Sequence, residues 1–139
     1  MRAPFTQLYV HLVWSTWDRA PLITSQIQTR LYAAMLQTCK ELKCDPIVVG
    51  GIEDHIHLLV HLHPTIAVAD LVKTIKGNSS HLVNHEIRPA GNFRWQGAYG
   101  AFSIRKDEVD QVTAYILNQA IRHAHNNLFS YFEQTDITA

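Results

Sequence analysis

The chain has 139 residues, of which 47% are hydrophobic, and this is the size and composition of one globular domain with its own core. Twelve Lys and Arg balance twelve Asp and Glu, so the overall charge does not by itself indicate a nucleic-acid partner. The chain contains no run of about 18 apolar residues and no secretion signal, which argues against a membrane protein. We therefore expect a cytoplasmic protein folded as a single domain over residues 1–139.

Two cysteines, Cys39 and Cys44, are too few for a disulfide framework or a four-cysteine zinc site. We expect both to be free thiols that are buried or half-buried.

Hydrophobic periodicity predicts the element order β-α-β-β-α-β followed by a further helix. The strands are predicted over residues 7–15, 45–52, 55–62 and 98–104. The helices are predicted from residue 24 or 25 to about 42, from about 65 to 83 with Gly77 as a candidate bend, and from about 106 to 126. This order is typical of an α+β, ferredoxin-like βαββαβ fold, in which helices cover one face of an antiparallel sheet, with an added C-terminal helix.

The predicted third strand, within DHIHLLVHLH, carries an unusual row of histidines. Side chains alternate along a strand, so one face carries four histidines and one leucine, and the other is wholly aliphatic. The first face holds His55, His57, Leu59, His61 and His63, and the second holds Ile56, Leu58, Val60 and Leu62. Packing alone explains such a face poorly, because a buried imidazole needs hydrogen-bond partners. His55 and His57 are roughly 6.5 to 7 Å apart at Cα, so their rings can converge on one ion. An isolated H-x-H is more often structural, and we expect His61 and His63 to be exposed.

The predicted final helix, within VTAYILNQAIRH, places Tyr115 and Gln119 four residues apart and therefore on one face. Taken alone, these are an ordinary half-buried tyrosine and a solvent-exposed glutamine. A tyrosine hydroxyl with a pKa near 10 is a weak nucleophile unless a cation polarises the electrophile. Two imidazoles and an amide oxygen could hold such a cation and leave positions for phosphate oxygens. This donor set suits Mg²⁺ or Mn²⁺ as well as Zn²⁺.

The charges are unevenly distributed along the chain. Residues 73–106 contain six basic residues and one acidic one, a net charge of +5, whereas residues 107–139 have a net charge of −4. A basic middle segment can follow a phosphate backbone, although such a segment is more often a solvated face.

Five segments in this order and spacing resemble the small single-tyrosine HUH transposases of bacterial insertion sequences that move as single strands. They are YVHLVWST at 9–16, DHIHLLV at 54–60, DLVKTIKGNSS at 70–80, WQGAY at 95–99 and YILNQ at 115–119. The pair of histidines followed by Y-x-x-x-Q is the most specific part of the resemblance.

The resemblance implies that His55, His57 and Gln119 bind Mg²⁺ or Mn²⁺ and that Tyr115 is the catalytic nucleophile. The reaction it implies is cleavage and rejoining of single-stranded DNA at hairpin-containing element ends, through a 5′-phosphotyrosine and without ATP. It also implies a homodimer with joined sheets, in which the tyrosine helix can complete the partner's site.

The resemblance further suggests a set of DNA contacts in the basic segment. The candidates for backbone contacts are Lys73, Lys76, Asn78, Arg94 and Arg105, and those for stacking on bases are Phe93, Trp95 or Tyr99. Two features depart from the family: Trp17-Asp18 stands where relatives often carry a basic residue, and the overall charge is neutral.

Three alternatives remain open from the sequence. A domesticated relative that acts on chromosomal repeat hairpins would carry the same residues. A non-catalytic nucleic-acid binding module would use the sheet while Tyr115 is structural. A small zinc hydrolase would use His55, His57 and other histidines.

Overall fold

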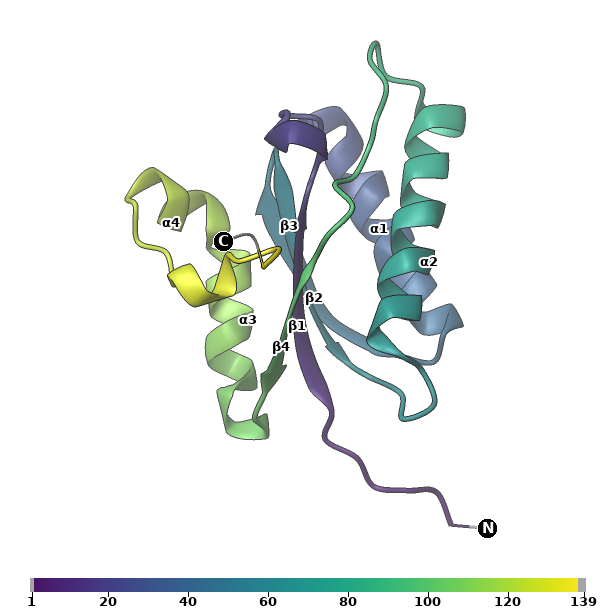
Figure 1. The fold of residues 1–139 in the computed structure, drawn as a ribbon, viewed down its shortest axis with the longest axis vertical. Helices are drawn as coiled ribbons and strands as arrows, with labels where there is room; N and C mark the ends of the chain where they lie inside the picture. The colour runs from purple at the N-terminus through teal and green to yellow at the C-terminus, as the bar shows by residue number, and fades with distance from the viewer. Residues whose placement is uncertain (1, 138–139) are drawn as a thin grey trace.

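The computed structural model describes residues 2–137, and its centre is a four-stranded antiparallel sheet (Figure 1). The predicted domain's first residue and last two residues lie outside this range. The strands are β1 (Tyr9–Ser15), β2 (Asp45–Ile52), β3 (His55–His61) and β4 (Gly100–Ile104). Their order is β2-β3-β1-β4, with every neighbouring pair antiparallel. The predicted α+β, ferredoxin-like fold is confirmed, and the predicted strands differ from the observed ones by at most two residues at an end.

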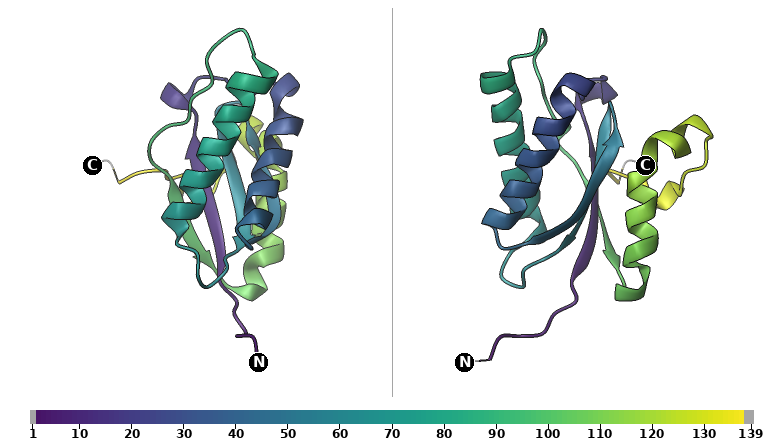
Figure 2. Two further views of the ribbon diagram at one scale, coloured as in Figure 1. Left: turned by 90° about the vertical axis from the view of Figure 1, so that its right-hand side faces the viewer. Right: turned by 180° about the vertical axis from the view of Figure 1, so that it is seen from behind.

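Two long helices, α1 (Ser25–Glu41) and α2 (Val68–Leu82), pack side by side on one face of the sheet (Figure 2). The main core lies between these helices and the aliphatic side chains of the two central strands, and it includes Leu12, Trp14, Ile56, Leu58 and Val60. Because alternate residues of β3 point in opposite directions, this packing directs the histidines away from α1 and α2.

The second helix does not bend where the sequence suggested. α2 continues through Gly77, and the departure from α geometry comes at Val83–Ile87, which form a wider π turn. Within residues 2–137, no helix is both long enough and apolar enough to cross a membrane. Cys39 and Cys44 are free and buried, as predicted.

The prediction of one long C-terminal helix over residues 106–126 is wrong. A short 3-10 turn at Lys106–Glu108 leads into α3 (Val109–Leu117), and α4 (Gln119–Ala124) follows after a break at Asn118, whose φ is −99° and ψ is 19°. Asparagine is a weak helix former because its side chain competes for backbone hydrogen bonds. Both helices and the residues after them cover the face of the sheet opposite α1 and α2, so the sheet is covered on both faces (Figure 2).

A glycine in β2 allows α3 to lie close to the sheet. Gly50 pairs with His57 of β3, and a Cβ at Gly50 would lie 2.6 Å from the carbonyl oxygen of Ile116 in α3. Cβ atoms essentially never approach another heavy atom so closely. Any larger residue at position 50 would therefore push away the helix that carries Tyr115.

Candidate metal and tyrosine site

His55 and His57 lie on the face of β3 that α3 and α4 cover, and both imidazoles are buried, with 1% and 0% of their surface exposed. The second nitrogen of each ring has a partner. His55 Nδ1 lies 2.7 Å from Asp54 Oδ1, and His57 Nδ1 lies 2.8 Å from Nε2 of His11 in β1. The two Nε2 atoms are therefore the ones available to the site. The rings themselves lie in a T-shaped arrangement with centroids 5.0 Å apart.

The other two histidines of this row lie outside the site. His61 and His63, which we expected to be exposed, are half-buried. His61 stacks on Tyr9 and its Nε2 lies 3.2 Å from Thr6 Oγ1, because the segment before β1 continues alongside the end of β3.

The two predicted residues of the final helix are both buried beside the histidines, although they belong to separate helices. Tyr115 is fully buried in a second, smaller core that includes Leu59 and Ile116. Gln119 Oε1 lies 3.3 Å from His55 Nε2. The break at Asn118 does not separate the pair, because Gln119 Nε2 still donates a hydrogen bond to the carbonyl oxygen of Tyr115 at 3.4 Å.

His123 joins the site although the sequence analysis did not single it out. Its Nε2 lies 3.0 Å from Gln119 Oε1 and 3.3 Å from His55 Nε2. The signal was present in the sequence, because Tyr115, Gln119 and His123 repeat every four residues and so follow one side of a helical segment.

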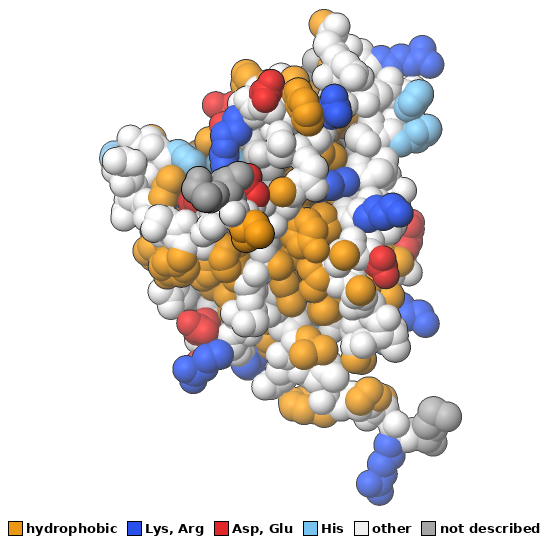
Figure 3. All heavy atoms as spheres, in the orientation of Figure 1, with side chains coloured by type: hydrophobic (Ala, Val, Ile, Leu, Met, Phe, Trp, Pro, Cys, Tyr) orange, Lys and Arg blue, Asp and Glu red, His pale blue; other side chains and the backbone are white. Residues whose placement is uncertain are grey.

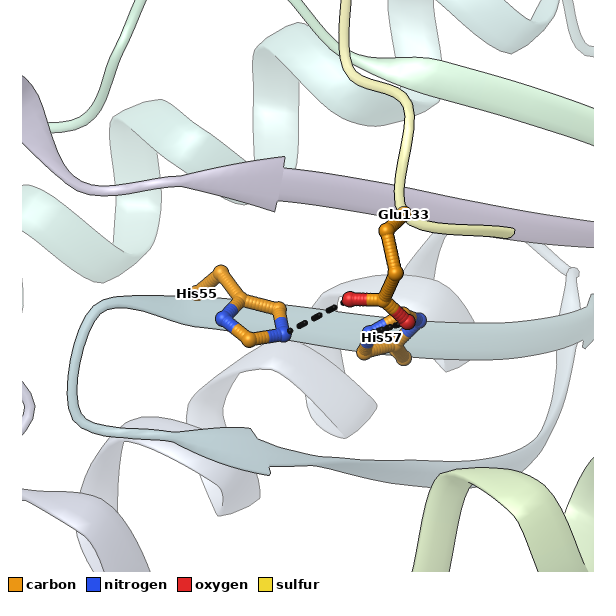
Figure 4. A group of neighbouring side chains, drawn as sticks. All are labelled: His55, His57 and Glu133. Atoms are coloured by element: carbon orange, nitrogen blue, oxygen red, sulfur yellow. Dashed lines mark ion pairs between the residues drawn. The ribbon is translucent and has the colours of Figure 1, made fainter. Parts of the chain in front are cut away.

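Glu133 also joins the site, and its carboxylate lies between the two strand histidines (Figure 4). Its Oε1 lies 3.3 Å from His55 Nε2 and its Oε2 lies 3.3 Å from His57 Nε2. The Tyr115 hydroxyl donates a short hydrogen bond to the same Oε2. Gly100 makes room for the segment that contains Glu133, because a Cβ at Gly100 would collide with the carbonyl oxygen of Gln134. No sequence pattern indicates Glu133, since it follows an irregular segment and reaches the site only through tertiary packing.

The pKa values of the site residues depend on two opposing effects, burial and the charges of close neighbours. Burial by itself lowers the pKa of His55, but hydrogen bonds and charge from Glu133 and Asp54 outweigh it and raise that pKa above its ordinary value. Burial is the larger effect at His57, whose pKa is lowered, and it lowers the pKa of His11 to about 3. Burial would raise the pKa of the Glu133 carboxyl, but its hydrogen bonds with the two strand histidines hold that pKa well below its usual range.

The Tyr115 hydroxyl is held in its protonated form. Burial raises the pKa of Tyr115 well above the ordinary value of 10, and the hydrogen bond to the ionised Glu133 raises it further. A backbone hydrogen bond from Phe129 N–H to the phenol oxygen, at 3.2 Å, acts weakly in the opposite direction. The phenol ring also stacks on the Phe129 ring, with centroids 4.7 Å apart.

His55, His57 and Glu133 have the composition of a divalent-cation site. One ligand atom from each, two imidazole nitrogens and one carboxylate oxygen, lies within 4.8 Å of the others. The amide oxygen of Gln119 lies beside them. A mixed nitrogen and oxygen set without thiolate suits Mn²⁺, Mg²⁺ or Zn²⁺, and the burial of the imidazoles leaves them few other partners.

Two of the predicted DNA contacts are occupied inside the fold. The Lys76 amine donates to the carbonyl oxygens of Gln96 and Ala98 at 2.7 and 3.0 Å, and burial lowers its pKa to about 8. Trp95 is only 7% exposed, and its indole Nε1 donates to Ser79 Oγ at 2.9 Å. Base stacking on Trp95 would require its ring to leave the core.

The other four candidates for backbone contacts are exposed, whereas the stacking candidates Phe93 and Tyr99 are buried and half-buried. Arg94 stacks its guanidinium 3.8 Å from the Trp17 ring centroid, and Arg105 forms an ion pair with Asp107 at 3.0 Å. Lys73 and Asn78 are exposed on α2, on the side of the sheet opposite the histidines. On the side of the molecule that Figure 3 shows, the Lys and Arg side chains are spread out, with apolar atoms between many of them, and do not form one continuous patch.

A ferredoxin-like sheet with an H-x-H pair on a central strand, faced by a tyrosine and a glutamine from a C-terminal helical segment, defines the single-tyrosine HUH class of DNA-processing protein. A family model described as "Transposase IS200 like" matches residues 4–119. The chain therefore belongs to the IS200-like transposase family.

Similar proteins agree with this assignment. The ISDra2 transposase TnpA of Deinococcus radiodurans is 24% identical over 118 residues, which cover 81% of this chain and 84% of that protein. A crystal structure described as a transposase of Deinococcus radiodurans R1 has 22% identity and a TM-score of 0.67, and the match covers 86% of this chain and 95% of that one. A REP-associated tyrosine transposase bound to a REP hairpin has 17% identity and a TM-score of 0.64, over 92% of this chain and 74% of that one.

Proposed function

We propose that this protein cleaves and rejoins single-stranded DNA at hairpin-containing ends through a 5′-phosphotyrosine, with Tyr115 as the nucleophile. The observation that carries the proposal is that the Tyr115 hydroxyl and the Nε2 atoms of His55 and His57 all converge on one carboxylate, that of Glu133, within a single chain. A nucleophile and cation ligands that meet at one point are what the attack on a phosphodiester requires.

A divalent cation, Mg²⁺ or Mn²⁺, would be held by His55 and His57 together with Gln119 or Glu133. When bound, it would act as a Lewis acid on the scissile phosphate. Burial and the fixed Nδ1 partners of the two imidazoles support this role, because they orient each ring with its Nε2 toward the site.

Tyr115 would supply the covalent chemistry. Its Oη forms a bond to phosphorus, the bond between phosphorus and the 3′ oxygen breaks, and that oxygen leaves as a 3′-hydroxyl. The hydroxyl proton of Tyr115 is released to water as the bond to phosphorus forms, and the leaving oxygen takes up a proton in its place. The ester energy is retained in the phosphotyrosine, so attack by a free 3′-hydroxyl reseals DNA without ATP.

The C-terminal segment, which follows α4 and carries Phe129 and Glu133, has to move away from Tyr115 before DNA can react. Tyr115 is fully buried, its ring stacks on Phe129, and Glu133 lies at the point where the phosphate must come. We therefore regard the arrangement with Glu133 between the histidines as a resting state, in which the nucleophile is protonated and covered.

DNA with a hairpin is the proposed partner, and two copies of the chain are proposed to act together in the cytoplasm. The hairpin bound to the similar REP-associated transposase supports this substrate. Exposed Lys73, Asn78, Arg94 and Arg105 remain our candidates for contacts with the DNA backbone.

The decisive experiment is to incubate the protein with single-stranded, hairpin-containing DNA and Mn²⁺ and to look for a protein–DNA species that resists denaturation. We expect Tyr115→Phe to abolish this species and to retain DNA binding. Tyr32→Phe is the matched control, because Tyr32 lies in α1, on the face of the sheet opposite Tyr115. Binding without any covalent species in the wild-type protein would instead favour a non-catalytic binding module, and activity with Zn²⁺ alone would favour a hydrolase.

A further inference from the structure

His11 is a buried histidine that the proposed chemistry does not use. It lies in the middle of the central strand β1, is fully buried, and faces α3 and the C-terminal segment. Its neighbours Leu12 and Trp14 belong to the main core. The rings of Phe102, Phe132 and Tyr115 surround His11, with centroids 5.8, 4.7 and 6.5 Å from its own. An imidazole in such surroundings is costly to bury unless it makes a specific hydrogen bond.

The hydrogen bond that His11 makes is to His57. In the register of β1 and β3, His11 lies opposite Leu59, so His57 is its diagonal neighbour on the same face of the sheet. His11 Nε2 lies 2.8 Å from His57 Nδ1, and both rings are fully buried. The other nitrogen of His11, Nδ1, has no hydrogen-bond partner among the described residues. Among the described residues, His57 is therefore the one hydrogen-bond partner of the His11 side chain.

One proton lies between these two nitrogens, and its position decides what His57 can do. If His57 carries the proton on Nδ1, it donates to His11 and its Nε2 keeps a free lone pair. If His11 donates instead, His57 is neutral only with its proton on Nε2, the atom that faces Glu133 and the site. A cation ligand needs the first arrangement.

We propose that His11 is the positioning residue of His57: as a neutral acceptor it favours, once Glu133 has moved away, the tautomer and ring orientation that leave His57 Nε2 free to bind the cation. This inference rests on the proposed function. Asp54 occupies the equivalent place for His55, whose Nδ1 lies 2.7 Å from Asp54 Oδ1. Each of the two strand histidines thus has a hydrogen-bond acceptor at its Nδ1, a carboxylate for His55 and an imidazole for His57.

The test is Mn²⁺ binding by the 139-residue chain without DNA, measured from the electron paramagnetic resonance signal of free Mn²⁺. His11→Leu fills a similar volume and removes the acceptor, and we expect it to weaken Mn²⁺ binding about 10- to 100-fold. His11→Gln places an amide oxygen near the position of Nε2, and we expect it to bind within a few-fold of the wild type. His11→Asn is polar but too short to reach His57, and we expect it to behave like His11→Leu. Thermal unfolding checks that each variant is folded.

The outcomes separate this inference from the proposed function. Wild-type affinity in His11→Leu, or in His11→Asn if the leucine variant does not fold, would overturn the role of His11 and leave the metal site standing. Equal loss in His11→Gln and His11→Asn would also overturn it, because the hydrogen bond would then not be the cause. A wild-type protein that binds no Mn²⁺ would overturn the metal site itself, and the role of His11 with it.

Discussion

Replacing Gly50 by alanine tests how the sheet positions the tyrosine helix. The new Cβ would lie 2.6 Å from the Ile116 carbonyl oxygen, whereas ordinary van der Waals contact begins at 3.4 Å, so α3 would have to retreat by roughly 0.8 Å. Forcing a methyl group into a packed contact costs about 1–3 kcal/mol, and the lost flexibility of the unfolded chain offsets part of it. We expect the free energy of unfolding to fall by about 1–2 kcal/mol.

The effect of Gly50→Ala on DNA cleavage should exceed its effect on stability. Tyr115 lies one residue before Ile116, and a displacement near 1 Å can reduce a reaction rate about a hundredfold. We therefore expect a covalent DNA adduct to form about a hundred times more slowly at a temperature where the variant is fully folded.

Gly77→Ala is the matched control for stability. A Cβ at Gly77 meets no heavy atom within 4 Å, and the residue lies inside α2. Alanine there should stabilise the protein by about 0.5–1 kcal/mol in urea unfolding. If Gly50→Ala were as stable as the wild type and formed the adduct at the same rate, the close contact between β2 and α3 would not be what positions Tyr115.

Three further predictions concern individual side chains. Glu133→Gln should lower the pKa of Tyr115 while leaving it above 10, because the ionised Glu133 adds to the effect of burial; NMR titration of the tyrosine ring carbons measures this, and an unchanged pKa would contradict the hydrogen bond. Lys76→Met should cost about 1–3 kcal/mol of stability, because two loop carbonyls lose their donor, whereas Lys73→Met on the exposed side of α2 should change stability by less than about 0.5 kcal/mol in the same urea unfolding. Burial raises the pKa of the Cys39 thiol to about 12, so iodoacetamide at pH 8 should modify Cys39 only after unfolding; rapid modification of the native protein, detected by mass spectrometry, would show that Cys39 is accessible.

The local sequence was enough to predict the strands, and also which face of its strand or helix each site residue occupies. Alternation along β3 put His55 and His57 on one face and Ile56, Leu58 and Val60 on the other, and that division is fixed by backbone geometry. The four-residue spacing of Tyr115 and Gln119 likewise predicted that both side chains lie on the same side of the helical segment, even though the helix breaks between them.

Contacts between residues that lie far apart in the sequence could be identified only from the tertiary structure. Glu133 reaches the histidines through an irregular segment, and Lys76 and Trp95 turn inward because the loop after α2 packs against that helix. Sequence periodicity reports which side of an element a residue occupies, but not which distant segment will cover that side. That choice depends on close packing and on hydrogen bonds that form only once the whole chain has folded.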